Sequence, residues 1–302
     1  MIAFNKIFKS LFAKFLSEET KEKSEKIIIY IAILSFLFHL LLIGLADLEW
    51  IKFDDISGLL KNPITAIYTP FSFILLYEAY LLVYYLPKST TKYIGKQYEI
   101  ITLIIIRRIF KDLYKLEFTN NWFSKQDNIV FLSDVLAVLI LFYLIYLYYK
   151  IVEVKAIQKI SVEVANFINL KKIIATILVP VFLMLAIYNF SFWIFENLFA
   201  ASQKGVAIKN INKIFFDEFF TILILIDVLL LLFSFLHTDK FNQVIRNSGF
   251  IISTILIKLT FNIEGVLNTV ITVVAVLLGV LILYIYNKYE KLQNLPISDG
   301  VV

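Results

Sequence analysis

The sequence predicts an all-α, polytopic integral membrane protein of about eight transmembrane helices, arranged as a parallel tandem repeat of four plus four. Of the 302 residues, 60% are hydrophobic, and the mean hydropathy of +0.82 is far above that of a soluble chain of this length. Apolar runs of about 20 residues, which a bilayer core of about 30 Å requires, recur along the chain. Charged residues inside these runs recur at a spacing of about 150 residues.

The expected transmembrane segments follow one another with short polar breaks between them. They cover residues 27–46, 64–86, 95–114, 128–149, 173–195, 215–236, 245–262 and 266–287. The third and seventh are the weakest, because Arg107, Arg108 and Lys258 interrupt them. If those two segments are re-entrant, six crossings remain.

Basic residues in the connections predict the orientation, since Lys and Arg accumulate in short cytoplasmic loops. With the N-terminus inside, 18 basic residues fall in inner segments and eight in outer ones. We therefore expect a multi-pass protein of the plasma (inner) membrane with both termini in the cytoplasm.

Three segments outside the bilayer complete the expected domain organisation. Residues 1–26 alternate apolar and basic positions at helical spacing, which is typical of an amphipathic helix at the membrane surface; packing against a partner subunit is the alternative. Residues 150–172 form a cytoplasmic amphipathic linker, for which a simple solvated connection is equally compatible. This linker joins the four-helix halves 27–149 and 173–287, and residues 288–302 form a short cytoplasmic tail.

The two halves share a pattern of polar landmarks when the chain is shifted on itself by about 150 residues. The matched positions are Glu78 with Asp227, Lys96 and Gln97 with Arg246 and Asn247, and Arg108 with Lys258. An even number of crossings per repeat gives both halves the same orientation, so we expect them to superpose by a rotation about an axis near the membrane normal. Inner loops that simply gather basic residues would explain Lys96 and Arg246 without a repeat.

Ionisable side chains within apolar helices are the candidates for function, because burying them costs several kcal/mol unless they have a partner or water. They are Glu78, Asp227, Arg107, Arg108, Lys258, Asp134 and His39, joined by Lys96, Gln97, Arg246 and Asn247. Arg108 and Asp134 both lie on the order of 10 Å from the outer boundary, so they could pair.

Each candidate has a structural alternative. The helix expected over residues 95–114 could end early, with Arg107 and Arg108 both reaching outward to the surface. Glu78, whose polar partner we expect to be Lys96 or Gln97, could serve a purely structural network. His39 is more often a hydrogen-bonded packing residue than a proton relay.

Several classes of function are disfavoured. The chain has no cysteine and two histidines, and it lacks H-E-x-x-H, G-x-S-x-G, P-loop and G-x-G-x-x-G motifs, so we expect no enzyme, metal site or cofactor. The formal charge of +5 is too mild to indicate nucleic acid. We expect an ion or small-solute channel or transporter with a polar route along the segments 64–86, 95–114, 215–236 and 245–262. The alternative is a membrane scaffold or sensor subunit of a larger complex; a homo-oligomer or a protein partner at the cytoplasmic face fits either function.

Overall fold

In the computed structural model, the described part of the chain is helical and contains no strand. This part comprises residues 2–48, 63–113, 116, 122–152, 162–195, 211–235 and 241–293. Its α-helices are α1 (Ile2–Phe15), α2 (Glu18–Asp47), α3 (Tyr68–Tyr85), α4 (Thr90–Asp112), α5 (Gln126–Val152), α6 (Val162–Phe195), α7 (Ile211–Phe235), α8 (Phe241–Thr260) and α9 (Val266–Gln293). Two short 3-10 helices, η1 (Pro63–Ile67) and η3 (Trp122–Ser124), precede α3 and α5. Each predicted apolar segment coincides with one helix, from α2 to α9 in order.

Four helices are long and apolar enough to cross a membrane. The corresponding segments are Ser10–Asp47, Gln126–Val152, Asn166–Tyr188 and Val266–Leu292, which lie mainly on α2, α5, α6 and α9. These long apolar helices support a membrane protein. Within the described residues, α3, α4, α7 and α8 provide no comparable segment.

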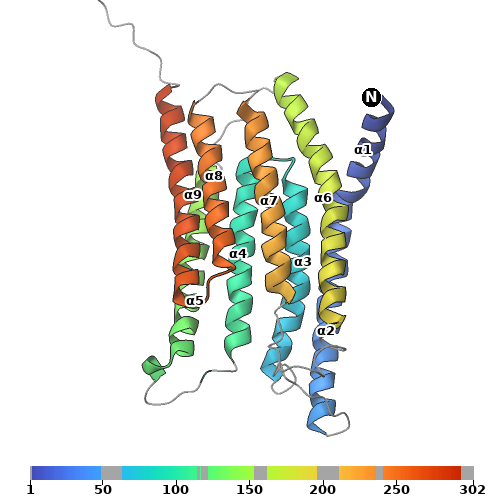
Figure 1. Ribbon diagram of the computed structural model, residues 1–302, viewed down its shortest axis with the longest axis vertical. Helices are drawn as coiled ribbons and strands as arrows, with labels where there is room; N and C mark the ends of the chain where they lie inside the picture. Colours follow the sequence, from blue (N-terminus) through green and yellow to red (C-terminus); the bar gives the residue numbers. More distant parts are fainter. Residues whose placement is uncertain are drawn as a thin grey trace, which may run out of the picture.

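The helices form two layers of four (Figure 1). In this view α2 to α5 lie behind and follow one another from right to left, while α6 to α9 lie in front in the same order. From α2 to α9 successive helices run in alternating directions, and α1 and the last residues of α9 lie at the same, upper end of the view. Between the layers α5 packs against α9, α4 against α8 and α3 against α6. A twofold rotation about an axis along the helices would reverse the order of one layer, so the common order departs from a simple rotation of that kind.

The apolar helices present much of their surface outward, whereas the bundle centre is aromatic. In α2 only Ala32 and Ile43 are buried, and large side chains such as Phe38 face outward. A helix this apolar on its outward faces is suited to lipid. The largest fully buried aromatic side chains lie on α4, α5, α7 and α8; they are Tyr93, Tyr98, Tyr148, Phe219, Phe220 and Phe250.

The N-terminal segment does not form one helix over residues 1–26. Helix α1 ends at Phe15, and Ser17 caps α2 by accepting a hydrogen bond from the Thr20 backbone N–H at 3.1 Å. The Tyr80 hydroxyl of α3 donates to the Phe15 carbonyl at 2.9 Å, and α1 packs along α6. The predicted boundary at residue 26 therefore lies inside the continuous helix α2.

The predicted linker and tail are also partly helical. Helix α5 continues to Val152 and α6 begins at Val162, so the linker predicted over residues 150–172 overlaps both helices. Residues 153–161 lie outside the described part of the chain. Helix α9 extends to Gln293, six residues into the predicted tail, and residues 294–302 lie outside the description.

Candidate functional site

Asp227 on α7 is almost completely buried, with 8% of its surface exposed, and it binds two side chains of α4. Its Oδ2 accepts a hydrogen bond from the Tyr93 hydroxyl at 3.4 Å and another from Gln97 Nε2 at 3.3 Å. Gln97 Oε1 in turn accepts from the Thr254 hydroxyl of α8 at 2.7 Å. We call these four residues the Asp227 cluster; it joins three helices in the bundle interior.

A cavity of about 40 Å³ lies beside Asp227 and is also lined by Lys171 of α6 and Asn247 of α8. Lys171 is 6% exposed, and its Nζ donates to the Thr90 hydroxyl at 2.9 Å. Lys171 and Asp227 are in electrostatic contact but form no direct ion pair. A water molecule needs about 10–15 Å³ of such space and two or more polar partners, so the cavity has room for two or three waters.

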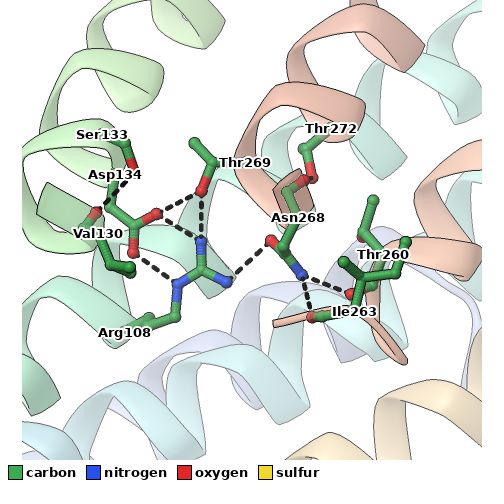
Figure 2. Close-up of polar contacts among 9 residues, drawn as sticks. All are labelled: Arg108, Val130, Ser133, Asp134, Thr260, Ile263, Asn268, Thr269 and Thr272. Atoms are coloured by element: carbon green, nitrogen blue, oxygen red, sulfur yellow. Dashed lines mark hydrogen bonds and ion pairs between the residues drawn. The ribbon is translucent and has the colours of Figure 1, made fainter. Parts of the chain in front are cut away.

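A second cluster surrounds Arg108, towards the opposite end of α4 (Figure 2). Arg108 Nε and Nη2 donate to the two carboxylate oxygens of Asp134 on α5, at 2.6 and 2.5 Å. The guanidinium also donates to Asn268 Oδ1 at 2.8 Å and to the Thr269 hydroxyl at 3.1 Å, both on α9. Thr269 donates to Asp134 Oδ1 at 2.6 Å. We call these four residues the Arg108 cluster; the predicted ion pair between Arg108 and Asp134 is confirmed.

Glu78 of α3 lies in a different polar environment from Asp227. Glu78 Oε2 is buried and has no hydrogen-bond partner within the described residues, but Glu78 is in electrostatic contact with Lys96. Lys96 forms an ion pair with Glu99 one turn along α4, and Glu99 also accepts a hydrogen bond from the Tyr149 hydroxyl of α5. Of the two partners expected for Glu78, Lys96 is nearby, whereas Gln97 belongs to the Asp227 cluster.

The remaining predicted residues make local contacts. Lys258 of α8 forms an ion pair with Asp217 of α7 at 3.5 Å, and His39 Nδ1 shares a hydrogen bond with the Thr69 hydroxyl at 2.5 Å. Helix α4 continues to Asp112 and Arg107 is buried, so the alternative in which both arginines reach the surface from an early helix end is wrong.

Arg246 is separated from the Asp227 cavity that its neighbour Asn247 lines. Its guanidinium lies over the Tyr286 ring of α9, 4.5 Å from the centroid, and it lines a second cavity between α8 and α9. The structure therefore brings Asp227, Gln97 and Asn247 together in one region. Arg108 and Asp134 form a second group, and the other candidates lie apart from both.

Sequence reasoning missed several polar partners. Lys171 was assigned to the cytoplasmic linker, and Thr254, Asn268 and Thr269 are uncharged residues that apolar helices commonly contain. The adjacent Asn268 and Thr269 do lie near the start of the last apolar segment, at a depth similar to that of Asp134. That common depth was the one available signal for their contact.

The described residues contain no group of three or more His, Cys, Asp or Glu side chains that could hold a metal ion. Comparisons with protein-family models, with curated proteins and with solved structures found no match to this chain.

Proposed function

We propose that this chain is an eight-span membrane protein that moves a small cation, in the simplest case a proton, along a polar route between α3, α4, α7 and α8. The observation that carries the proposal is Asp227, a buried carboxylate that lines a cavity of water size in the interior of an apolar bundle. Ionisable groups inside membrane helices mark ion and proton pathways, because their burial is otherwise costly.

The order of the helices supports eight spans and a tandem repeat. In each half the first and fourth helices, α2 with α5 and α6 with α9, contain the long apolar segments, and each of the two helices between them carries a charged residue inside its predicted apolar segment. These residues are Glu78 on α3, Arg108 on α4, Asp227 on α7 and Lys258 on α8. In Figure 1 these charge-bearing helices lie near the middle of the bundle, with α5 and α9 on one side and α2 and α6 on the other. A polar helix can cross a bilayer when its polar face meets protein or water rather than lipid.

The free lone pairs of Asp227 and the size of its cavity favour a small cation. A carboxylate that accepts only two long hydrogen bonds, at 3.3 and 3.4 Å, retains lone pairs for a proton, a water or a cation. A hydrated metal ion carries several waters and does not fit in about 40 Å³, whereas a proton moves along hydrogen-bonded side chains and a few waters.

Between the Asp227 cluster and the Arg108 cluster the described interior is largely apolar, and the buried hydroxyls of Thr102 and Thr272 there donate to backbone carbonyls of their own helices. Ile101 and Ile105 of α4 lie between Gln97 and Arg108, and both are buried. Leu223, one turn from Asp227 on α7, is also fully buried. A proton cannot cross such a layer without water, so the proposed transport requires a second arrangement of the helices that hydrates it.

Ion flux in reconstituted liposomes tests the proposal. Asp227→Asn keeps the side-chain shape and removes the charge, so we expect it to abolish proton uptake, and Glu78→Gln to reduce it, with expression and oligomeric state unchanged. Glu19→Gln, which alters an exposed ion pair with Lys23, is the matched control and should leave the flux unchanged. Stable variants with wild-type flux, or a wild type that moves no monovalent cation, proton or chloride, would refute it.

A scaffold or sensor subunit without transport is the second candidate, and the Arg108 cluster favours it. The carboxylate of Asp134 accepts hydrogen bonds from both Arg108 and Thr269, as expected of a static network that fixes helix register. Glu78→Leu distinguishes the two functions. In a dry structural network this change chiefly lowers folding yield, whereas in a transport route the folded protein is recovered and its flux is altered.

A further inference from the structure

We propose that the groove between the start of α8 and the end of α9 binds an anionic phospholipid, whose phosphate is held by Arg246 and Asn242 and whose acyl chain lies along the apolar wall of the groove. The inference is independent of transport through the Asp227 cavity, because the two cavities share no lining residue.

The groove encloses about 150 Å³ and combines apolar, aromatic and basic side chains. It is lined by Phe241, Asn242, Ile245, Arg246, Ile282, Ile285, Tyr286 and Tyr289. Its rim is open to the surroundings of the bundle, since Ile245, Ile285 and Tyr289 are all exposed. An apolar groove open to lipid beside tyrosines is suited to an acyl chain near the headgroup level.

Two side chains that line this groove each have an N–H group with no acceptor within the described residues. Arg246 Nε and Nη2 both donate to Asn247 Oδ1, at 3.1 and 2.9 Å, and Nη1 has no acceptor within the described residues. Asn242, one turn earlier on α8 and only 9% exposed, accepts through Oδ1 from the Gln243 backbone N–H, and its Nδ2 likewise has no described acceptor. A phosphate group offers several acceptor oxygens to donors of this kind.

The position of these two donors on α8 also favours anion binding. They lie in the first two turns of the 20-residue helix α8, where the helix dipole and the unpaired backbone N–H groups favour an anion. Arg246 also lies over the Tyr286 ring, which holds the planar guanidinium in a fixed orientation. Among the described residues, the acid in electrostatic contact with Arg246 is Glu290 of α9, and it opposes an anion there.

The location of the groove indicates that the bound phosphate belongs to a lipid rather than to free phosphate. The groove lies at the end of the bundle where the positive-inside distribution places the cytoplasmic leaflet, which carries anionic lipids. A free phosphate would leave the apolar wall of Ile245, Ile282 and Ile285 without an occupant, whereas a phospholipid covers it.

Native mass spectrometry of the purified chain with added lipid tests the proposal. Phosphatidylglycerol should bind at least about fivefold more tightly than phosphatidylcholine with the same acyl chains, the factor expected for one basic residue near the membrane surface. Arg246→Gln should abolish this preference, Asn242→Ala should weaken it, and Glu290→Gln should strengthen it. Lys288→Gln is the matched control, because Lys288 lies over the Tyr284 ring and does not line the groove.

The outcomes decide between the sources of the anion. An equal affinity of the wild type for the two lipids overturns the proposal, and so does a preference that survives Arg246→Gln. Binding of inorganic phosphate without a phosphatidylglycerol preference also overturns it, because it assigns the groove to a free anion. If Arg246→Gln does not fold, the wild-type comparison and Asn242→Ala still decide.

Discussion

The Arg108 cluster gives the sharpest prediction of stability. Asp134 is 1% exposed and accepts three hydrogen bonds, two from Arg108 and one from Thr269, so Asp134→Leu leaves the guanidinium without its counter-ion. Breaking a buried ion pair in this way costs about 3–5 kcal/mol of unfolding free energy. Arg108 is 28% exposed and keeps Asn268 and Thr269 as acceptors, so we expect a smaller loss of about 2–3 kcal/mol.

A double variant tests whether the instability of the single variants comes from the unpaired charge. Arg108→Met together with Asp134→Leu removes both charges and leaves apolar side chains in their place, so it should be within about 1 kcal/mol of wild type. Arg108→Met alone leaves the buried Asp134 carboxylate without its counter-ion and should cost about 3 kcal/mol. With about 2–3 kcal/mol for Asp134→Leu and about 1 kcal/mol for the double variant, the cycle gives a coupling of about 4 kcal/mol, well above the average of about 0.6 kcal/mol for hydrogen bonds between membrane helices.

Far-UV circular dichroism during reversible unfolding from mild detergent into SDS measures each free energy. Glu19→Gln, in the exposed pair with Lys23, is the control and should leave the unfolding free energy unchanged. A coupling near 0.6 kcal/mol, or a double variant as unstable as the sum of the single ones, would refute a buried, charge-dependent cluster.

Two further predictions concern topology and packing. Tags at either end and in residues 150–171 should be accessible only from the cytoplasm, and a tag at 197–213 only from outside; an external linker tag would overturn the count of eight spans. Gly279→Ala should lower stability by about 1–3 kcal/mol, because a Cβ there would collide with the Tyr98 hydroxyl, and Tyr98→Phe should recover part of the loss. Gly44→Ala is the contrast: its Cβ meets nothing within 4 Å, so thermal unfolding should show an equal or higher midpoint.

The sequence predicted the helices well because each is an apolar run bounded by polar residues, which is a local property. It also predicted the pairing of Arg108 with Asp134, since depth along two helices follows from residue counts. It did not predict that Asp227 binds Gln97, and it left Lys96 and Gln97 as alternative partners of Glu78. Those contacts depend on the rotation of each helix and on its neighbours, and an almost uniformly apolar surface leaves no periodic pattern from which to read either.

Helix α4 connects the two polar clusters, and this has a consequence for any transport. Through Gln97 it binds α7 and α8, and through Arg108 it binds α5 and α9. Thr90, at its first turn, accepts a hydrogen bond from Lys171 of α6. A helix with polar partners on so many sides cannot be strongly apolar, which explains why α4 provides no long apolar segment.

A rearrangement that hydrates the apolar layer around Ile101 and Ile105 must move α4 relative to its neighbours. Such a movement strains the hydrogen bonds of the Arg108 cluster, because this cluster holds the end of α4 that lies away from Asp227. The cluster that favours a structural role would then set the energetic barrier to opening. Under the transport proposal, weakening it should therefore raise the rate of proton flux while lowering stability, whereas in a scaffold only stability would fall.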